Sequence, residues 1–197
     1  MPLIIEGPDC AGKTMLAKRL GSPTWKRTEF DPQQSMLAAA EALQWATWHI
    51  DAGRSCPIMD RWFYSEIIYG ELRHGNAPRW DWLRLLEDQA FSIGTMVVWL
   101  VPPWEIVETR HARRGDDDGK GGGIGIELLR KIWEAYRDFY PRLPMLLHGD
   151  TKGIPTDAEV EEIWNNVKRG EHAAREERRG FYPSIEDGRP AGPKTPA

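Results

Sequence analysis

Short apolar runs along the chain alternate with longer segments in which apolar residues recur at helical spacing. The apolar runs lie at residues 3–5, 57–59, 95–101 and 145–147. Runs that are apolar at nearly every position predict parallel strands covered on both faces. The longer segments predict helices at about 13–20, 35–53, 63–73, 81–92, 104–113, 126–140 and 156–168, with a loop over 22–34. Strands that alternate with helices predict an α/β fold with a mainly parallel sheet flanked by helices.

Two segments depart from this pattern. Residues 115–125, GDDDGKGGGIG, predict a flexible glycine-rich loop, and we expect a mobile lid at about residues 110–125. From residue 169 onward Glu, Arg, Gly and Pro dominate, which predicts a poorly ordered tail over 169–197. The expected organisation is one domain over residues 1–168 that carries a lid, followed by the tail.

Composition restricts the classes of partner. The chain has 197 residues, enough for one domain with a substantial core. Its net charge of −4 argues against a large DNA- or RNA-binding face, because phosphate backbones attract clustered Lys and Arg. No apolar run approaches the length that spans a membrane, and the first residues lack the pattern of a signal peptide. Cys10 and Cys56 predict no disulfide, so we expect a reducing, cytoplasmic setting.

Residues 7–14, GPDCAGKT, match the phosphate-loop (P-loop) pattern G-x-x-x-x-G-K-[ST] at every fixed position. Gly7 and Gly12 permit the tight backbone that turns N–H groups toward phosphate oxygens. We expect Lys13 to reach the β- and γ-phosphates and Thr14 to offer its hydroxyl to Mg²⁺, at the positive end of the following helix. A chance match arises in under about one per cent of chains this long. The predicted cofactors are ATP and Mg²⁺, and the predicted cofactor-binding residues are Gly7, Asp9, Cys10, Ala11, Gly12, Lys13 and Thr14.

The dipeptide Asp60-Arg61 comes directly after the second predicted strand. Strand C-termini converge on the ligand crevice of an open α/β sheet. Asp60 is therefore expected near Mg²⁺ or the acceptor, and Arg61 on a phosphate group. Taken alone the dipeptide would favour a surface ion pair, but beside a P-loop the functional interpretation is favoured.

Three arginines, Arg110, Arg113 and Arg114, cluster where a predicted helix meets the glycine-rich loop. Arginines beside a mobile lid suit phosphoryl transfer, which depends on positioning and on charge stabilisation. The alternative is a favourable interaction of arginine with a helix C-terminus. We favour a catalytic role for the group, without choosing among its members.

The two motifs together resemble the thymidylate kinase group of nucleoside monophosphate kinases, especially its divergent, virus-like members. The resemblance rests on EGPDCAGKT at residues 6–14 and on DRWFYS at 60–65 followed by Tyr69-Gly70, and the order of motifs follows that family over about residues 1–168. It implies transfer of the terminal phosphate of ATP to a (deoxy)nucleoside monophosphate, giving the diphosphate. It also implies that Asp9 contacts the acceptor sugar, Arg61 the acceptor phosphate and Tyr69 the acceptor base or sugar. Trp62 and Ser65 of the second motif are further candidates for substrate binding.

The chain also departs from that family's pattern. Cys10 stands where some members carry arginine, which implies that the catalytic arginine comes from the lid. The family's DREPG segment is missing, with Lys26-Arg27-Thr28-Glu29-Phe30 as the nearest stretch, and residues 35–52 hold no Arg or Lys. These departures imply a remodelled acceptor site.

Two other functions remain open from the sequence. The same core could phosphorylate a nucleoside or a hydroxymethylated base within DNA, where Trp25, Trp62 and Phe63 offer aromatic faces for stacking. A nucleotide-binding switch is a different class, but the DRxxxS motif and the lid arginines favour transfer over switching. The expected partner is a small nucleotide, with a homodimer left open.

Overall fold

The strands form a parallel sheet, as predicted. The computed structural model describes residues 1–26, 35–53, 56–75, 80–114, 124–139, 157–158 and 160–169. Within these residues the sheet has the order β2-β3-β1-β4. Its strands are β1 (Leu3–Glu6), β2 (Thr24–Lys26), β3 (Ile58–Asp60) and β4 (Met96–Trp99). All three strand pairs are parallel, so the C-termini of the four strands lie along one edge.

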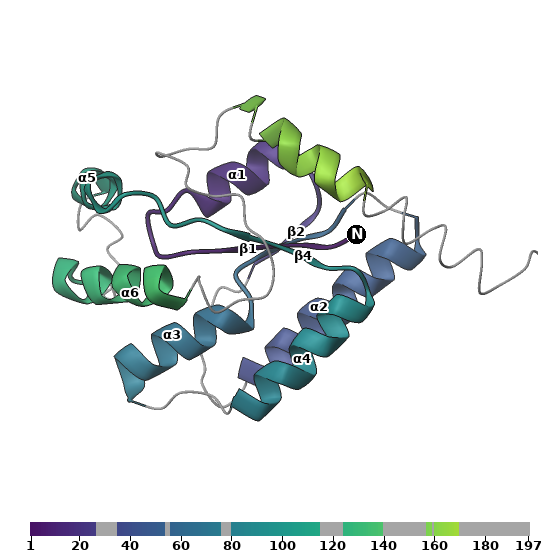
Figure 1. Cartoon of the computed structure of the whole chain (residues 1–197), viewed down its shortest axis with the longest axis horizontal. Helices are drawn as coiled ribbons and strands as arrows, with labels where there is room; N and C mark the ends of the chain where they lie inside the picture. Colours follow the sequence, from purple (N-terminus) through teal and green to yellow (C-terminus); the bar gives the residue numbers. More distant parts are fainter. Residues whose placement is uncertain are drawn as a thin grey trace, which may run out of the picture.

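Helices cover both faces of this sheet (Figure 1). They are α1 (Lys13–Leu20), α2 (Ser35–Asp51), α3 (Phe63–His74), α4 (Trp80–Ser92), α5 (Trp104–Arg114) and α6 (Ile126–Phe139). Residues 157–158 and 160–169 are also helical. Helix α1 and the residues 160–169 lie on one face, while α2, α3, α4 and α6 lie on the other (Figure 1). The α/β architecture predicted from the sequence is confirmed, with helix bounds within a few residues of those expected.

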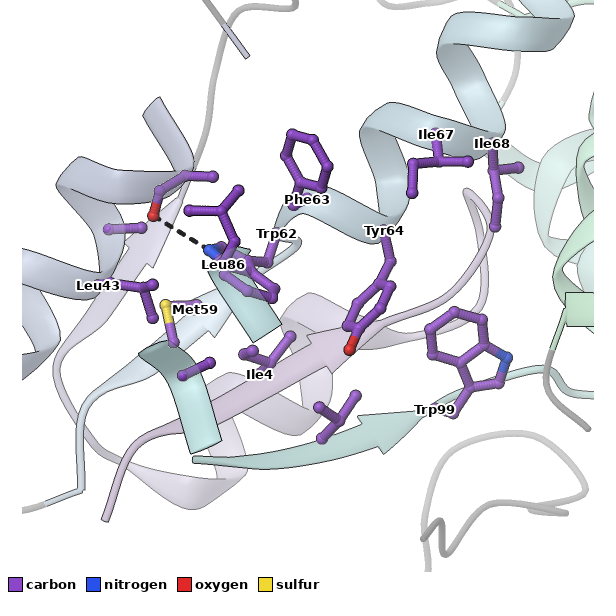
Figure 2. Close-up of a cluster of buried hydrophobic side chains, with 14 of the residues drawn as sticks. Ile4, Leu43, Met59, Trp62, Phe63, Tyr64, Ile67, Ile68, Leu86 and Trp99 are labelled. Carbon is purple, nitrogen blue, oxygen red and sulfur yellow. Dashed lines mark hydrogen bonds between the residues drawn. The ribbon is translucent and has the colours of Figure 1, made fainter. Parts of the chain in front are cut away.

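Alternating side chains of the buried strands divide the core in two. Ile4 of β1 packs in the larger cluster, beneath α2, α3, α4 and α6, together with Met59, Trp62, Tyr64 and Trp99 (Figure 2). Leu3 and Ile5 point to the opposite face, where a second cluster contains Leu16, Leu20, Ile163 and Val167. Because side chains alternate along a strand, the same geometry decides which face receives the polar residues at the strand ends.

The loop predicted over residues 22–34 is wrong in part, because Thr24–Lys26 forms the edge strand β2. It pairs with β3 in the register Thr24↔Ile58, Trp25↔Met59 and Lys26↔Asp60. The strand has three residues that are half-exposed or exposed, so it carries no apolar run that a sequence pattern could reveal. The last predicted strand (145–147), most of the predicted lid and nearly all of the predicted tail lie outside the described residues. No described helix is long and apolar enough to span a bilayer.

Candidate active site

The P-loop connects β1 to α1 at the C-terminal edge of the sheet. At Gly7 φ is +151°, and a Cβ built there would lie 2.1 Å from the carbonyl oxygen of Leu100. Only glycine fits this position, because the loop passes directly against the backbone that follows β4. Gly12 precedes α1 with φ +103°, and Cys10 adopts φ +62°. The sequence pattern thus produces the curled loop that phosphate binding requires.

Lys13 is buried and is held by the loop itself. Its ammonium donates to the carbonyl oxygens of Gly7 at 2.8 Å and Pro8 at 2.6 Å. Burial, reinforced by the nearby charge of Arg61, lowers the pKa of Lys13 to about 7. A phosphate group would supply the negative charge that raises this pKa and holds the ammonium protonated.

Thr14 and Asp60 meet across the gap between α1 and β3. The Thr14 hydroxyl donates to Oδ2 of Asp60 at 3.0 Å, and the Asp60 side chain is 3% exposed. A hydroxyl and a carboxylate are hard oxygen donors of the kind that Mg²⁺ takes, with waters and phosphate oxygens completing its six ligands. Among the described residues no cluster of three or more His, Cys, Asp or Glu could hold a metal by itself. The donor set therefore fits Mg²⁺ bound together with a nucleotide.

Arg61 lies directly after β3 in the left-handed conformation, with φ +73°. Its Nη2 donates to Oδ1 of Asp9 at 2.5 Å and to the hydroxyl of Tyr69 at 3.0 Å, and its guanidinium stacks on the Tyr69 ring at 4.7 Å. The Tyr69 hydroxyl in turn donates to Oδ2 of Asp9 at 3.1 Å. Burial opposes the charge of Arg61, but Tyr69 and Asp9 outweigh it, so its pKa lies well above the ordinary value. Asp9 is thus joined to two residues more than 50 positions away in the sequence, and the three form one hydrogen-bonded cluster.

The three arginines of α5 do not occupy equivalent places. Nη1 of Arg110 donates to the carbonyl oxygens of Cys10 at 3.1 Å and Ala11 at 3.0 Å, on the outer side of the P-loop. Arg113 and Arg114 are exposed and line the cavity described next. All three arginines thus line the same cavity, and Arg110 in addition contacts the backbone of the P-loop.

These groups enclose a cavity of about 820 Å³. Its walls are Asp9, Cys10, Gly12, Lys13, Thr14, Met15, Lys26, Asp60, Arg61, Trp62, Ser65, Glu66, Tyr69, Arg110, Arg113 and Arg114. Of the residues predicted to bind nucleotide or to catalyse transfer, only Gly7 and Ala11 are not on this wall. Trp25 and Phe63, which were candidates for stacking on a base in DNA, are not on it either, and Phe63 is fully buried. Six side chains of the wall are cationic and three are carboxylates, although the whole chain carries a net charge of −4. This local excess of positive charge suits a polyanionic ligand.

Trp62 and Ser65 line the cavity although both residues are buried. Nε1 of Trp62 donates to the carbonyl oxygen of Ala39 at 3.1 Å, and its ring belongs to the larger core cluster (Figure 2). The Ser65 hydroxyl donates to Oε2 of Glu6 at 2.6 Å. Both side chains therefore have structural contacts in addition to their places on the wall.

The sequence motifs contain or adjoin two polar residues of this region to which the sequence assigned no role, Glu6 and Lys26. Glu6 is fully buried, and its carboxylate accepts the backbone N–H of Trp62 at 2.6 Å and the hydroxyl of Tyr136 at 3.1 Å. Burial raises the pKa of Glu6. The strand alternation could have found it, since Glu6 shares the face of Ile4, toward α3 and α6. Lys26 could not have been found this way, because β2 was itself unpredicted.

No protein-family model and no curated protein sequence matches the chain. Solved structures do match. The crystal structure of the YorR protein from Bacillus subtilis, in complex with phosphorylated GDP, has a TM-score of 0.64 at 23% identity, covering 87% of this chain and 98% of that chain. Deoxyadenosine kinase from M. mycoides with bound dATP has a TM-score of 0.52 at 16% identity, covering 85% of this chain and 100% of that chain. The same enzyme with bound dCTP gives 0.52 at 17% identity, covering 86% and 100%. At these identities the likeness shows that the chain shares the fold of these nucleotide-bound proteins.

Proposed function

We propose that the chain is an ATP- and Mg²⁺-dependent phosphotransferase that converts a (deoxy)nucleoside monophosphate to the diphosphate. The observation that carries the proposal is the cavity itself, where six cations face three carboxylates beside a complete P-loop. A nucleoside triphosphate and a nucleoside monophosphate are both strongly anionic, so a cavity of this charge favours binding them together. The likeness to the thymidylate kinase group rests on the sequence motifs.

The donor half of the site is the P-loop with Thr14 and Asp60. Backbone N–H groups and Lys13 would hold the β- and γ-phosphates of ATP. Thr14 and Asp60 would hold Mg²⁺, which supplies charge neutralisation at the phosphate oxygens when bound. Because Asp60 is buried, its carboxylate is held in one orientation, which favours a fixed geometry for transfer.

The acceptor half is the cluster of Asp9, Arg61 and Tyr69. Arg61 would hold the acceptor's phosphate, while Asp9 and Tyr69 would contact its sugar and base. An oxygen of the acceptor's phosphate attacks the γ-phosphorus, the bond from that phosphorus to the β–γ bridging oxygen breaks, and ADP leaves with the negative charge. No proton acceptor is required when the attacking oxygen is already ionised.

Arg113 and Arg114 would stabilise the phosphoryl group during transfer. Charge spreads over three equatorial oxygens in the transition state, and the P-loop itself offers Lys13 as its cation because position 10 is cysteine. Both arginines stand at the cavity rim, where the predicted lid begins. Arg110 contributes indirectly in this scheme, through the loop carbonyls that it contacts.

One observation favours a second candidate, transfer to a hydroxyl of a nucleoside or of a hydroxymethylated base in DNA. Arg61 is already neutralised by Asp9 at 2.5 Å, so an acceptor's phosphate would have to compete with that carboxylate. A neutral acceptor would not have to compete with Asp9 for Arg61. In that reaction the hydroxyl oxygen attacks the γ-phosphorus, its proton passes to a carboxylate such as Asp9, the bond from that phosphorus to the β–γ bridging oxygen breaks, and ADP leaves.

The experiment is an ATP-consumption assay against matched acceptors, each deoxynucleoside beside its own monophosphate, and DNA with and without hydroxymethyluracil. We expect consumption to depend on a monophosphate. The Lys13→Ala variant should be inactive, and Lys18→Ala on the exposed face of α1 should retain full activity as the matched control. Consumption that needs a nucleoside or modified DNA instead would select the second candidate. Consumption independent of any acceptor would contradict both.

A further inference from the structure

The edge strand β2 places one lysine against the two oxygens proposed to hold Mg²⁺. Lys26 is the last residue of β2 and lies in register with Asp60, the last residue of β3. Its Nζ is 3.6 Å from Oδ2 of Asp60 and 3.3 Å from Oγ1 of Thr14, while those two oxygens are 3.0 Å apart. One ammonium thus faces the same pair of oxygens that a metal ion would use.

We propose that Lys26 is a built-in competitor of Mg²⁺, a cation that pairs with Asp60 in the metal-free protein and must be displaced for the metal to bind. This inference rests on the proposed function, because it takes Thr14 and Asp60 as the metal site. It assigns to Lys26 the control of metal affinity at that site.

The carboxylate of Asp60 is buried and needs a nearby positive charge. A carboxylate that is 3% exposed needs a compensating charge, since an isolated buried charge is strongly unfavourable. Lys26 is the cation whose nitrogen lies within 4 Å of this carboxylate in the part of the chain that the structure describes. The ammonium of Lys13 donates instead to the carbonyl oxygens of Gly7 and Pro8. Lys26 therefore supplies the counter-charge in direct contact with Asp60, while Lys13 acts on it from farther away.

Mg²⁺ and the ammonium of Lys26 would have to occupy the same space beside Thr14. Mg²⁺ binds its oxygens at about 2.0–2.1 Å and requires six ligands in nearly octahedral order. An ion on Oγ1 of Thr14, with its waters, takes the space next to that oxygen in which the ammonium of Lys26 now lies at 3.3 Å. The charges of the two cations also repel each other at this range. Metal and ammonium consequently exclude each other from the pair of oxygens.

The side chain of Lys26 can move away from Asp60 without disturbing the fold. Its side chain is 53% exposed, and it stands on the edge strand rather than in the core. A lysine has a long flexible stem and keeps its hydration when its head moves into water. Displacement is therefore a change of side-chain position, and its free-energy cost is subtracted from the metal's binding free energy.

The test is direct binding of Mn²⁺, as a paramagnetic substitute for Mg²⁺, to the full chain in the absence of nucleotide, followed by electron paramagnetic resonance. At low ionic strength Lys26→Met should bind Mn²⁺ about fivefold more tightly, the factor that Coulomb's law gives for unit charges about 4 Å apart in water. Lys26→Gln should behave in the same way. The matched control, Lys18→Met, removes an equal charge from an exposed position of α1 and should leave the affinity unchanged.

A second arm separates this inference from the proposed function. Asp60→Asn should abolish Mn²⁺ binding in both the wild-type and Lys26→Met backgrounds. If Asp60→Asn leaves binding intact, the assignment of the metal site is wrong, and the proposed function loses its metal ligand. If Asp60→Asn abolishes binding but Lys26→Met does not strengthen it, only the competition is overturned. Weaker binding by Lys26→Met would likewise overturn it.

Discussion

Arg110 donates a hydrogen bond from Nη1 to the carbonyl oxygen of Cys10 at 3.1 Å, which links α5 to the outer side of the P-loop. A loop that binds phosphate must turn its N–H groups inward, which leaves carbonyl groups pointing outward. A second bond, to Ala11 at 3.0 Å, engages another of those carbonyls. Arg110 is therefore placed to hold the shape of the loop, whereas Arg113 and Arg114 are exposed side chains of the cavity wall.

This difference predicts two kinds of defect. Arg110→Ala should weaken ATP binding, because the loop loses partners for two carbonyls, a cost of about 1–3 kcal/mol. Arg113→Ala and Arg114→Ala should instead lower kcat with little change in ATP affinity, the pattern of an interaction made mainly in the transition state. Single-turnover rates and calorimetric ATP affinities for the three variants check this. Equal effects of all three on ATP affinity would contradict the division.

The lowered pKa of Lys13 predicts proton uptake when ATP binds. With a pKa of about 7, Lys13 is mostly neutral at pH 8 in the free protein, and the bound phosphates favour its charged form. Uptake should approach one proton at pH 8 and decrease toward pH 6, where Lys13 is already charged. Calorimetry in buffers of different ionisation enthalpy measures it. Lys13→Arg, whose side chain stays charged, is the control and should show no such uptake from this position.

Asp9→Asn distinguishes the two candidate acceptors. If the acceptor's phosphate competes with Asp9 for Arg61, removing the carboxylate charge should lower the KM for the monophosphate several-fold. If instead Asp9 accepts the proton of an attacking hydroxyl, the same change should lower kcat about 100-fold or more. Steady-state kinetics with a monophosphate and its nucleoside decide between these results. Arg61→Met serves as the complementary variant and should raise the KM for the monophosphate only.

The buried carboxylate of Glu6 predicts a large effect on stability. Its oxygens accept bonds from Trp62, Ser65 and Tyr136, which join the strand before the P-loop to α3 and α6. Tyr136→Phe removes the hydroxyl that bonds both the buried acid and Ser65, and it should lower the free energy of unfolding by about 1.5–3 kcal/mol. Glu6→Ala should cost more, because it leaves the N–H of Trp62 and both hydroxyls without this acceptor. Urea unfolding measures both, and a loss under about 0.5 kcal/mol for Glu6→Ala would contradict this view of the network.

The sequence predicted the elements that carry strong local patterns. β4 is apolar throughout and β1 is apolar up to Glu6, and α1 is fixed by the P-loop before it and by Gly21 after it, so these elements appeared where expected. β2 was missed because three exposed or half-exposed residues become a strand only through pairing with β3. Local propensity does not contain that long-range partner.

The residues of the candidate site also fall into two groups, those that a local pattern predicts and those that only the packing of distant segments brings together. The spacing within residues 7–14 brought Lys13 and Thr14 to the cavity, since the chemistry of phosphate binding is contained in one continuous segment. Lys26 entered the site from an unpredicted strand, and Arg110 contacts the carbonyl oxygens of the P-loop as well as lining the cavity. Both depend on how distant segments pack. A pattern along the chain gives the residue types of such a site but not the contact that each one makes.

The central claim is that the acceptor is a nucleoside monophosphate. The most direct measurement is the position of the label after one turnover with ATP labelled in its γ-phosphate, in a mixture of deoxynucleosides and their monophosphates. We expect label in the β-phosphate of a deoxynucleoside diphosphate, and none with Lys13→Ala. Label on the 5′ oxygen of a former nucleoside, or released only as inorganic phosphate, would contradict it.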